Sequence, residues 1–382
     1  MLSPTRLTAL VALTFGLAAC DSAQDAPGSE AETAGALFDA SVFPTTNNIL
    51  ATQNLPDARN ADRVYRVTPS LSSASRLYDE QRLDDAIPQG VESLQQVAYA
   101  TATTRFFSTF DGEDGNGYIV RTNRRGEVNA VTQAGLNPKG VFVDIQVGTG
   151  FVGVADFGTS TANSQILIYN DSFADGEAPV ITITNLGTDG RAWDLFYSDS
   201  DDILFVAKTN GEVVAYDNFV SQAQDFIGFG VPVTPDREFA VSNPADNPRV
   251  KQSLNFHGVS YDDDTQILIV SDVRAPSNPL SGRIYTVDNA DEVGGPPNAP
   301  GTPSNLVDFR ARLRSPMGGN NTMLGNPVDI LGYGGDLYVA AKGTGKLLRF
   351  DNILTRTGQQ GNISPDAMRD LEGAESVSFF QR

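Results

Sequence analysis

Three kinds of hydrophobic segment recur in the same order along this chain, and this repetition limits the possible folds more than any other feature. The first kind is a short apolar segment that contains or precedes an aspartate. The second is more hydrophobic and ends in a small residue, and the third begins after a turn, usually with glycine. The four clearest copies of the second kind are 152–155, 204–207, 268–271 and 337–340. Such repetition favours one repeat architecture over several unrelated domains.

The spacing of the copies indicates the kind of repeat. The anchor valines of the four copies are Val154, Val206, Val270 and Val339. They lie 52, 64 and 69 residues apart, which is too long and too irregular for a solenoid. A four-stranded blade with variable outer loops fits this spacing. Acidic or glycine-rich turns at 199–202, 262–264 and 332–335 predict tight hairpins between the first two strands of a unit.

Two weaker copies and an isolated strand complete the count. A full unit is recognisable over 96–121, whereas the segment 48–67 has no convincing first strand. The segment 375–380 looks like a first strand with no sequel, so we expect it to complete the blade that begins at the N-terminus. The sequence thus predicts an all-β fold, a closed six-bladed β-propeller of four-stranded antiparallel blades. Seven blades would require an extra blade within 221–252 or 294–326, but both stretches are rich in proline and glycine and favour outer strands with long loops.

Composition supports this fold and excludes several functions. The 382 residues include 36 Gly and 21 Pro, as expected for many turns, and 40% are hydrophobic, which is enough for a packed core. A net charge of −20 argues against nucleic-acid binding, because an acidic surface repels phosphates. The single Cys precludes an intramolecular disulfide, and the single His precludes a histidine-rich metal site.

The strand order over 37–382 resembles that of bacterial six-bladed propellers of the broad NHL, gluconolactonase and regucalcin-like group. The resemblance rests on the succession of strands and on no sharp motif, since the chain has no WD, YWTD or Asp-box series. It implies a rigid ring with a central channel, whose mouth is the place where such proteins bind ligands.

The first 36 residues indicate export and anchoring. Residues 1–19 contain one basic residue, Arg6, followed by an apolar run that is too short for a comfortable membrane span. The sequence Leu-Ala-Ala before Cys20 resembles the bacterial lipobox, which implies cleavage before Cys20 and lipidation of its thiol and amino group (palmitate being one such acyl chain). Residues 20–36 are small and acidic and predict a flexible tether. We therefore expect a lipid-anchored envelope protein, on the outer side of the cytoplasmic membrane or in the outer membrane.

Polar residues at the starts of first strands and at the ends of second strands are expected to meet at one mouth of the channel. The ligand-binding candidates are Asp156, Arg191, Lys208, His257, Asp272, Asn326 and Lys342. Such a mixed-sign ring can bind a small polar ligand or a cation, or it can be a solvated channel whose charges neutralise one another. His257 can act as a general base or a metal ligand, but the absence of a nucleophile elbow favours a hydrogen-bonded channel or loop histidine. Trp193 and Asp194 lie within a repeat strand and are expected to serve packing and turn hydrogen bonds.

The resemblance to gluconolactonase-like propellers also implies a divalent cation, with Ca²⁺ the candidate and Asp156, Asp272 and Asn326 as its ligands. The glutamate early in the first blade and the repeated asparagines of that family are not evident here. The segment 111–117 looks like a calcium loop but fails the EF-hand pattern, so it is interpreted as a hairpin tip.

These observations favour a non-catalytic binding or scaffolding module over an enzyme. No cofactor and no catalytic residue is predicted, because neither a complete acid–base set nor a nucleophile elbow is found. The expected partners are the membrane, through the lipid anchor, and an envelope protein or a small polar ligand. The alternative is a metal-dependent, lactonase-like hydrolase at the channel mouth.

Overall fold

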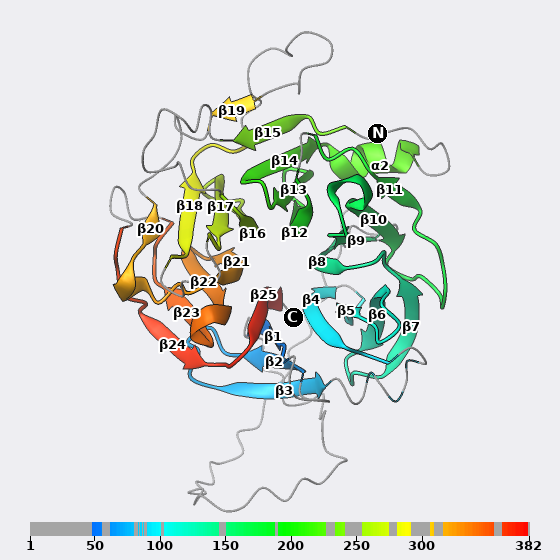
Figure 1. The fold of residues 1–382 in the computed structure, drawn as a ribbon, viewed down its shortest axis with the longest axis horizontal. Coiled ribbons are helices and arrows are strands. Elements are labelled where there is room, and N and C mark those ends of the chain that lie inside the picture. The colour runs from blue at the N-terminus through cyan, green and yellow to red at the C-terminus, as the bar shows by residue number, and fades with distance from the viewer. Residues whose placement is uncertain are drawn as a thin grey trace, which may run out of the picture. The chain divides into compact units, whose positions relative to one another are not determined.

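A computed structural model describes residues 48–55, 62–79, 83, 85, 87, 90–100, 103–144, 150–187, 190–226, 234–240, 254–274, 281–291, 306–308, 316–354 and 361–380. All of them belong to one compact unit, Phe38–Arg382. Six antiparallel sheets surround a central axis, as Figure 1 shows, which confirms the predicted six-bladed propeller. The predicted signal peptide (1–19), Cys20 and the tether (20–36) lie outside the described residues.

Each blade has four strands in sequence order from the axis outward, except that the last strand of the chain is the innermost strand of the first blade. The innermost strands are β25 (Ala374–Phe380), β4 (Ser93–Ala100), β8 (Pro138–Val143), β12 (Ala192–Ser198), β16 (Phe256–Asp262) and β21 (Pro327–Tyr333). The second strands are β1 (Asn48–Gln53), β5 (Arg105–Asp111), β9 (Phe151–Asp156), β13 (Ile203–Lys208), β17 (Ile267–Asp272) and β22 (Asp336–Ala341).

The two outer layers are shorter and less regular. The third strands are β2 (Arg63–Val67), β6 (Gly117–Asn123), β10 (Gln165–Asn170), β14 (Glu212–Asp217), β18 (Arg283–Val287) and β23 (Lys346–Phe350). The fourth strands are β3 (Ala74–Asp79), β7 (Val128–Gln133), β11 (Ile181–Ile183), β15 (Arg237–Ala240), β20 (Met317–Gly318) and β24 (Ala367–Asp370). The blade of β12 also carries β19 (Leu306–Asp308), which pairs in parallel with β15.

The two long stretches that could have held a seventh blade contribute outer strands instead. β15 lies within 221–252 and pairs with β14, and β20 lies within 294–326 and pairs with β18. A short helix, α2 (Phe219–Phe226), follows β14. No helix in the described part of the chain is long and apolar enough to cross a membrane.

The ring closes through β25, as the isolated strand predicted. β25 pairs antiparallel with β1, so that Ala51 lies opposite Val377. The junction is tight: Asn54 N–H donates to the Gly373 carbonyl at 2.8 Å, and a Cβ on Gly373 would lie 2.0 Å from the Asn54 carbonyl oxygen. Gly373 also has a φ of +67°, a conformation that glycine adopts without strain. Closure removes the exposed edges that an open array of blades would leave.

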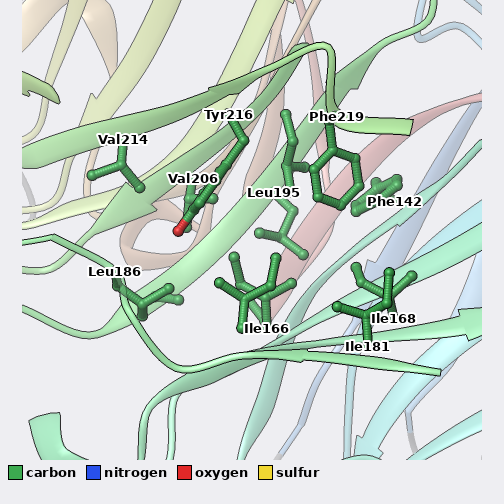
Figure 2. Close-up of a cluster of buried hydrophobic side chains, with 14 of the residues drawn as sticks. Phe142, Ile166, Ile168, Ile181, Leu186, Leu195, Val206, Val214, Tyr216 and Phe219 are labelled. Atoms are coloured by element: carbon green, nitrogen blue, oxygen red, sulfur yellow. The ribbon is translucent and has the colours of Figure 1, made fainter. Parts of the chain in front are cut away.

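The core fills the spaces between neighbouring blades. Figure 2 shows one such cluster, in which Ile166 and Ile168 of β10 lie across from Leu195 and Phe219 of the next blade. These side chains alternate along their strands with residues that pack on the other side, so both faces of a blade are buried. Because the blades are held on both sides, the inner strands form a rigid frame around the channel.

Candidate functional site in the central channel

Each of the six inner strands has a bulge or register shift near its first residues. The two residues at this irregularity occupy equivalent positions in all six blades. The outer ring consists of Gln95, Lys139, Trp193, His257, Val328 and Glu375. The inner ring consists of Gln96, Gly140, Asp194, Gly258, Asp329 and Ser376. We call the outer ring the charged mouth and the inner ring the waist. Bulges often re-aim side chains in this way.

Large and small residues alternate around the waist. Gln96, Asp194 and Asp329 come from every second blade, and the blades between them supply Gly140, Gly258 and Ser376. The glycines are required by space. A Cβ on Gly140 would lie 2.6 Å from the Cα of Asp194, and one on Gly258 would lie 2.8 Å from the Cα of Asp329.

The three large polar side chains are joined through Gln96. Its Nε2 donates to Asp194 Oδ1 at 3.0 Å and to Asp329 Oδ2 at 3.1 Å. Each of the three side chains also accepts a hydrogen bond from the backbone of the following blade: Gln96 from Val141 N–H, Asp194 from Val259 N–H and Asp329 from Val377 N–H. The backbone bonds thus join neighbouring blades, and the Gln96 amide joins three alternate blades across the axis.

The two waist carboxyls are buried without a cationic side chain in ion-pair contact among the described residues. Asp194 is 3% exposed and Asp329 is 4% exposed. Burial raises the pKa of Asp194, and burial together with the charge of Asp194 raises the pKa of Asp329 well above its usual range. The pair therefore tends to retain a proton at pH values where exposed aspartates are ionised.

Above the waist, the charged mouth is closely filled. The rings of Trp193 and His257 stack with centroids 3.6 Å apart and an angle of 15° between their planes. The Lys139 ammonium lies 5.7 Å from the Trp193 ring centroid. Burial, with the charges of Lys139 and Lys342, lowers the pKa of His257 to about 3, so the imidazole is neutral at physiological pH. The cavity left in this mouth measures about 20 Å³, enough for about one water molecule.

Three of the predicted ligand residues lie at equivalent second-strand ends and are used within their own blades. Asp156 ends β9 and Asp272 ends β17, and both are fully buried. Asp156 accepts hydrogen bonds from the backbone of Leu136, Asn137 and Gly158 and from the Gln165 side chain. Asp272 accepts from the backbone of Asn255 and Arg274, from the Arg274 guanidinium and from Tyr285. Lys208, at the end of β13, pairs with Glu212 at 2.9 Å.

Among the other predicted residues, the side chains of Arg191 and Lys342 are also engaged, whereas the Asn326 Oδ1 atom is buried with no hydrogen-bond partner among the described residues. Arg191 stacks its guanidinium 3.3 Å from the Phe157 ring centroid. The Lys342 ammonium forms an ion pair with Glu375 of the charged mouth. The backbone N–H of Lys342 donates to the Asn326 backbone carbonyl at 3.1 Å. Only His257 among the seven occupies a ring position. None of the seven lines either cavity of the channel.

Asp156 and Asp272, two of the three residues expected to hold a divalent cation, do not fit one. Four donors already point at the oxygens of Asp156 and four at those of Asp272, and N–H groups directed at a carboxylate exclude a metal ion from the same positions. In the part of the chain that the structure describes, no three His, Cys, Asp or Glu side chains are grouped as metal ligands. The segment 111–117 joins β5 to β6 as a hairpin tip, and Asp114 there accepts hydrogen bonds from Asn116 and Tyr118.

On the other side of the waist the channel widens into a cavity of about 280 Å³, which we call the aromatic chamber. Its aromatic lining comes from four inner strands: Tyr99 of β4, Phe142 of β8, Phe196 and Tyr197 of β12, and Phe379 of β25. Aliphatic residues, among them Val143 and Leu331, complete the walls. Gln96, Asp194 and Asp329 line both cavities, so the waist forms the polar floor of the chamber.

The rings of the chamber are fixed by packing. Phe142 and Tyr197 lie in contact with centroids 5.6 Å apart, and Phe379 stacks on Tyr333 at 4.2 Å. The Tyr197 hydroxyl donates to Asp202 at 3.0 Å. These contacts hold the walls in place before any ligand arrives, which reduces the entropy lost on binding.

No protein-family model matches this chain, and no curated protein matches it in sequence. Solved structures match its fold. A chain of a nidogen–laminin complex superposes with a TM-score of 0.53 and 13% identity, over 87% of this chain and 98% of that one. A periplasmic gluconolactonase from Pseudomonas aeruginosa gives 0.52 and 12%, over 87% and 98%. A putative 6-phosphogluconolactonase from Bacteroides fragilis gives 0.50 and 9%, over 88% and 98%. At these identities the similarity establishes the fold, whose neighbours include lactonase-like proteins and a binding module.

Sequence reasoning missed the waist and the chamber. The available signal was the second residue of the pair at the irregularity near the start of each first strand. From one blade to the next, this residue alternates between a large polar side chain and a small one. Gly140, Gly258 and Ser376 are informative only when set beside Gln96, Asp194 and Asp329. The aromatic residues lie two or more positions further along the same strands, where a hydrophobic residue is ordinarily expected to belong to the core.

Proposed function

We propose that this chain is a lipid-anchored protein of the bacterial cell envelope that works as a non-catalytic binding module, with the aromatic chamber as its ligand site. The observation that carries the proposal is the chamber itself: about 280 Å³, walled by aromatic rings on rigid strands and floored by three polar side chains. Ligand sites typically combine mainly apolar walls with a few convergent polar groups.

The arrangement of the charged mouth argues against catalysis there and favours the chamber as the binding site. A lactonase-like hydrolase at this mouth would need oxygens free to hold a cation or a general base ready to accept a proton. The oxygens of Asp156 and Asp272 accept hydrogen bonds from neighbouring loops, and His257 is stacked and buried. Fold neighbours act both in complexes and as enzymes, so the residues of the site, and not the fold, decide between these functions.

A ligand screen by thermal shift tests the chamber. Ligands that occupy it should raise the melting temperature, since binding at 100 times Kd stabilises a protein by about 2.7 kcal/mol. Val143→Phe, which places a larger side chain at the chamber wall, should abolish the shift. Trp193→Phe at the charged mouth is the matched control and should preserve it. A screen whose hits survive Val143→Phe but disappear with Trp193→Phe would place the site at the charged mouth.

The anchor is tested separately. The apolar run before Cys20 and the lipobox-like Leu-Ala-Ala motif support lipidation, and two or three acyl chains give stable attachment. Wild-type protein should fractionate with membranes, and Cys20→Ala should release it into the soluble fraction. Full retention of Cys20→Ala with membranes would contradict the anchor. The outer side of the cytoplasmic membrane and the outer membrane are distinguished by density-gradient separation of the two membranes.

A further inference from the structure

The ionisable side chains that line the aromatic chamber, tyrosines aside, are two carboxyls. Within the described residues its lining includes Asp194 and Asp329 and no lysine, arginine or histidine. We propose that the chamber binds a small organic cation, such as a quaternary or primary ammonium, with its positive charge directed at this carboxyl pair. This inference rests on the proposed function, because it names the class of ligand for the same site.

The carboxyls of the two channel regions differ in what balances their charge. At the charged mouth, Glu375 pairs with Lys342, and Asp111 lies 3.5 Å from the Lys139 ammonium. At the waist, the described hydrogen bonds to Asp194 and Asp329 come from the Gln96 amide, from backbone N–H groups and, through a shared proton, from one carboxyl to the other. These donors are neutral and hold the carboxyls in place without supplying a positive charge. An ammonium group in the chamber would supply it.

The walls select an organic cation over a metal ion. The face of an aromatic ring carries negative charge density and attracts cations, and several rings around one cavity are a common arrangement for recognising ammonium ligands. A calcium ion needs six to eight oxygen ligands, whereas most of the chamber lining is carbon, from residues such as Phe142, Phe196 and Phe379. A ligand with carbon groups around a positive charge can pack against the aromatic walls and place its charge near Asp194 and Asp329 at the floor. An anionic ligand would be repelled by the pair.

Binding of a cation should compete with a proton for the carboxyl pair. Other titratable groups near the waist lie on the charged-mouth side: Lys139 on β8, His257 on β16, Glu375 on β25 and Lys342 after β22. Burial, with the charges of Lys139 and Lys342, lowers the pKa of His257 to about 3, so the imidazole should not titrate between pH 5.5 and 8. On the chamber side, burial and the charges of Asp144 and Asp202 raise the pKa of Tyr197, so this phenol should not titrate in this range. The affinity for a permanently charged ligand should therefore rise with pH as the carboxyl pair loses its proton.

Choline and 3,3-dimethylbutan-1-ol form a suitable probe pair, because they share a shape and differ in charge. Titration calorimetry of the purified mature protein at pH 7.5 should show choline binding at least tenfold more tightly than the alcohol. The double substitution Asp194→Asn/Asp329→Asn should abolish the preference for choline over the alcohol. Phe196→Leu should weaken choline about tenfold through loss of one aromatic wall, and it gives a second readout if the double variant folds poorly. Between pH 5.5 and 8 the affinity for choline should rise and that for the alcohol should stay constant.

Two results would overturn the inference. Equal affinities for choline and the alcohol, with both lost in Val143→Phe, would show a chamber that binds ligands without selecting a cation, and the proposed function would stand. Absence of binding by both probes would exclude the cation class at millimolar concentration. In that case the ligand screen with Val143→Phe decides the proposed function on its own.

Discussion

The two ends of the central channel differ in how their charges are used. At the charged mouth and the adjoining second-strand ends, acidic and basic groups are abundant, but Asp156, Asp272 and Glu375 each already have donors or a cation of this chain in contact. At the aromatic chamber, charged groups are few, yet Asp194 and Asp329 are neutralised by no side chain in the described structure and lie at the floor of a real cavity. The comparison shows that a ring of charged residues marks a ligand site only when some of that charge is left for the ligand.

The residues that stabilise the fold are expected to differ from those that bind the ligand. The carboxylates at second-strand ends hold the loops that lead into the first strands, so their loss should unfold the protein more readily. The rings of the chamber are attached to strands that are already fixed by the core, so their truncation should affect binding more than folding.

The largest effect is expected from removal of the strand that lines both regions. Deleting Gly373–Arg382 removes β25, with Glu375 at the charged mouth and Phe379 at the chamber, and leaves an edge of β1 unpaired. We expect a loss of several kcal/mol out of the ~5–15 kcal/mol that a fold of this kind has. Urea denaturation measures it. An unchanged midpoint and slope would mean that the ring does not depend on closure.

Asp156→Ala should be the next most damaging change. It leaves the backbone N–H groups of Leu136, Asn137 and Gly158 without their acceptor, at about 3 kcal/mol in total. Asp156→Asn keeps one acceptor oxygen and should lose less. Neither variant should alter the affinity for choline when measured below its melting temperature. A stable Asp156→Ala protein that no longer binds ligand would assign the site to the second-strand ends and contradict the chamber.

Gly258→Ala tests the waist that separates the two regions. The new Cβ would lie 2.8 Å from both the Asp329 Cα and the Ile330 nitrogen, so neighbouring backbone must shift, at about 2 kcal/mol. Ser376→Ala occupies an equivalent ring position without added volume and serves as the control. Thermal denaturation of both variants measures the difference. Equal stability would show that the alternation of large and small residues at the waist is not required by packing.

The carboxyl pair should make stability depend on pH in an identifiable direction. The pKa values of Asp194 and Asp329 are raised in the folded state, so the folded protein binds more protons than the unfolded chain between pH ~4 and those raised values. Their contribution to the free energy of unfolding therefore falls as pH rises through this window. Asp329→Asn should flatten the dependence and gain about 1–2 kcal/mol relative to wild type at pH 8. The difference between the two proteins is read from denaturation at pH 5 and pH 8, and a constant difference would contradict the prediction.

The smallest change in stability should come from the chamber wall. Phe196 is partly exposed to the cavity, and Phe196→Leu should cost about 1 kcal/mol or less. Its affinity for choline should nevertheless fall about tenfold. If stability falls by several kcal/mol and affinity does not change, Phe196 belongs to the core and not to the site.

The sequence predicted the fold well because its information is local and repeated. Strands such as β9, β13 and β22 are apolar runs bounded by turns, and the isolated segment 375–380 indicated closure without any structure. Ring closure follows from counting first strands, because the blade that begins at residue 48 lacks one and the segment 375–380 is the one left over.

The site was less predictable because it depends on side chains that meet across blades. Sequence position correctly placed Asp156 and Asp272 at strand ends, but it did not show that backbone N–H groups from the loops before β8 and β16 occupy their oxygens. Asp194 and Asp329 are 135 residues apart and come together through the Gln96 amide and through a hydrogen bond between their own side chains. The depth of the chamber follows from the ring geometry, which no single segment encodes.

The most direct test of the account is to locate the ligand. Crystals grown with (2-bromoethyl)trimethylammonium can be measured at the bromine absorption edge, where the anomalous signal marks the ligand without ambiguity. One bromine peak is expected in the aromatic chamber, among Tyr99, Phe196 and Phe379. The ammonium of the ligand should point toward Asp194 and Asp329. A peak at the charged mouth beside Trp193 and His257, with the chamber empty, would contradict it.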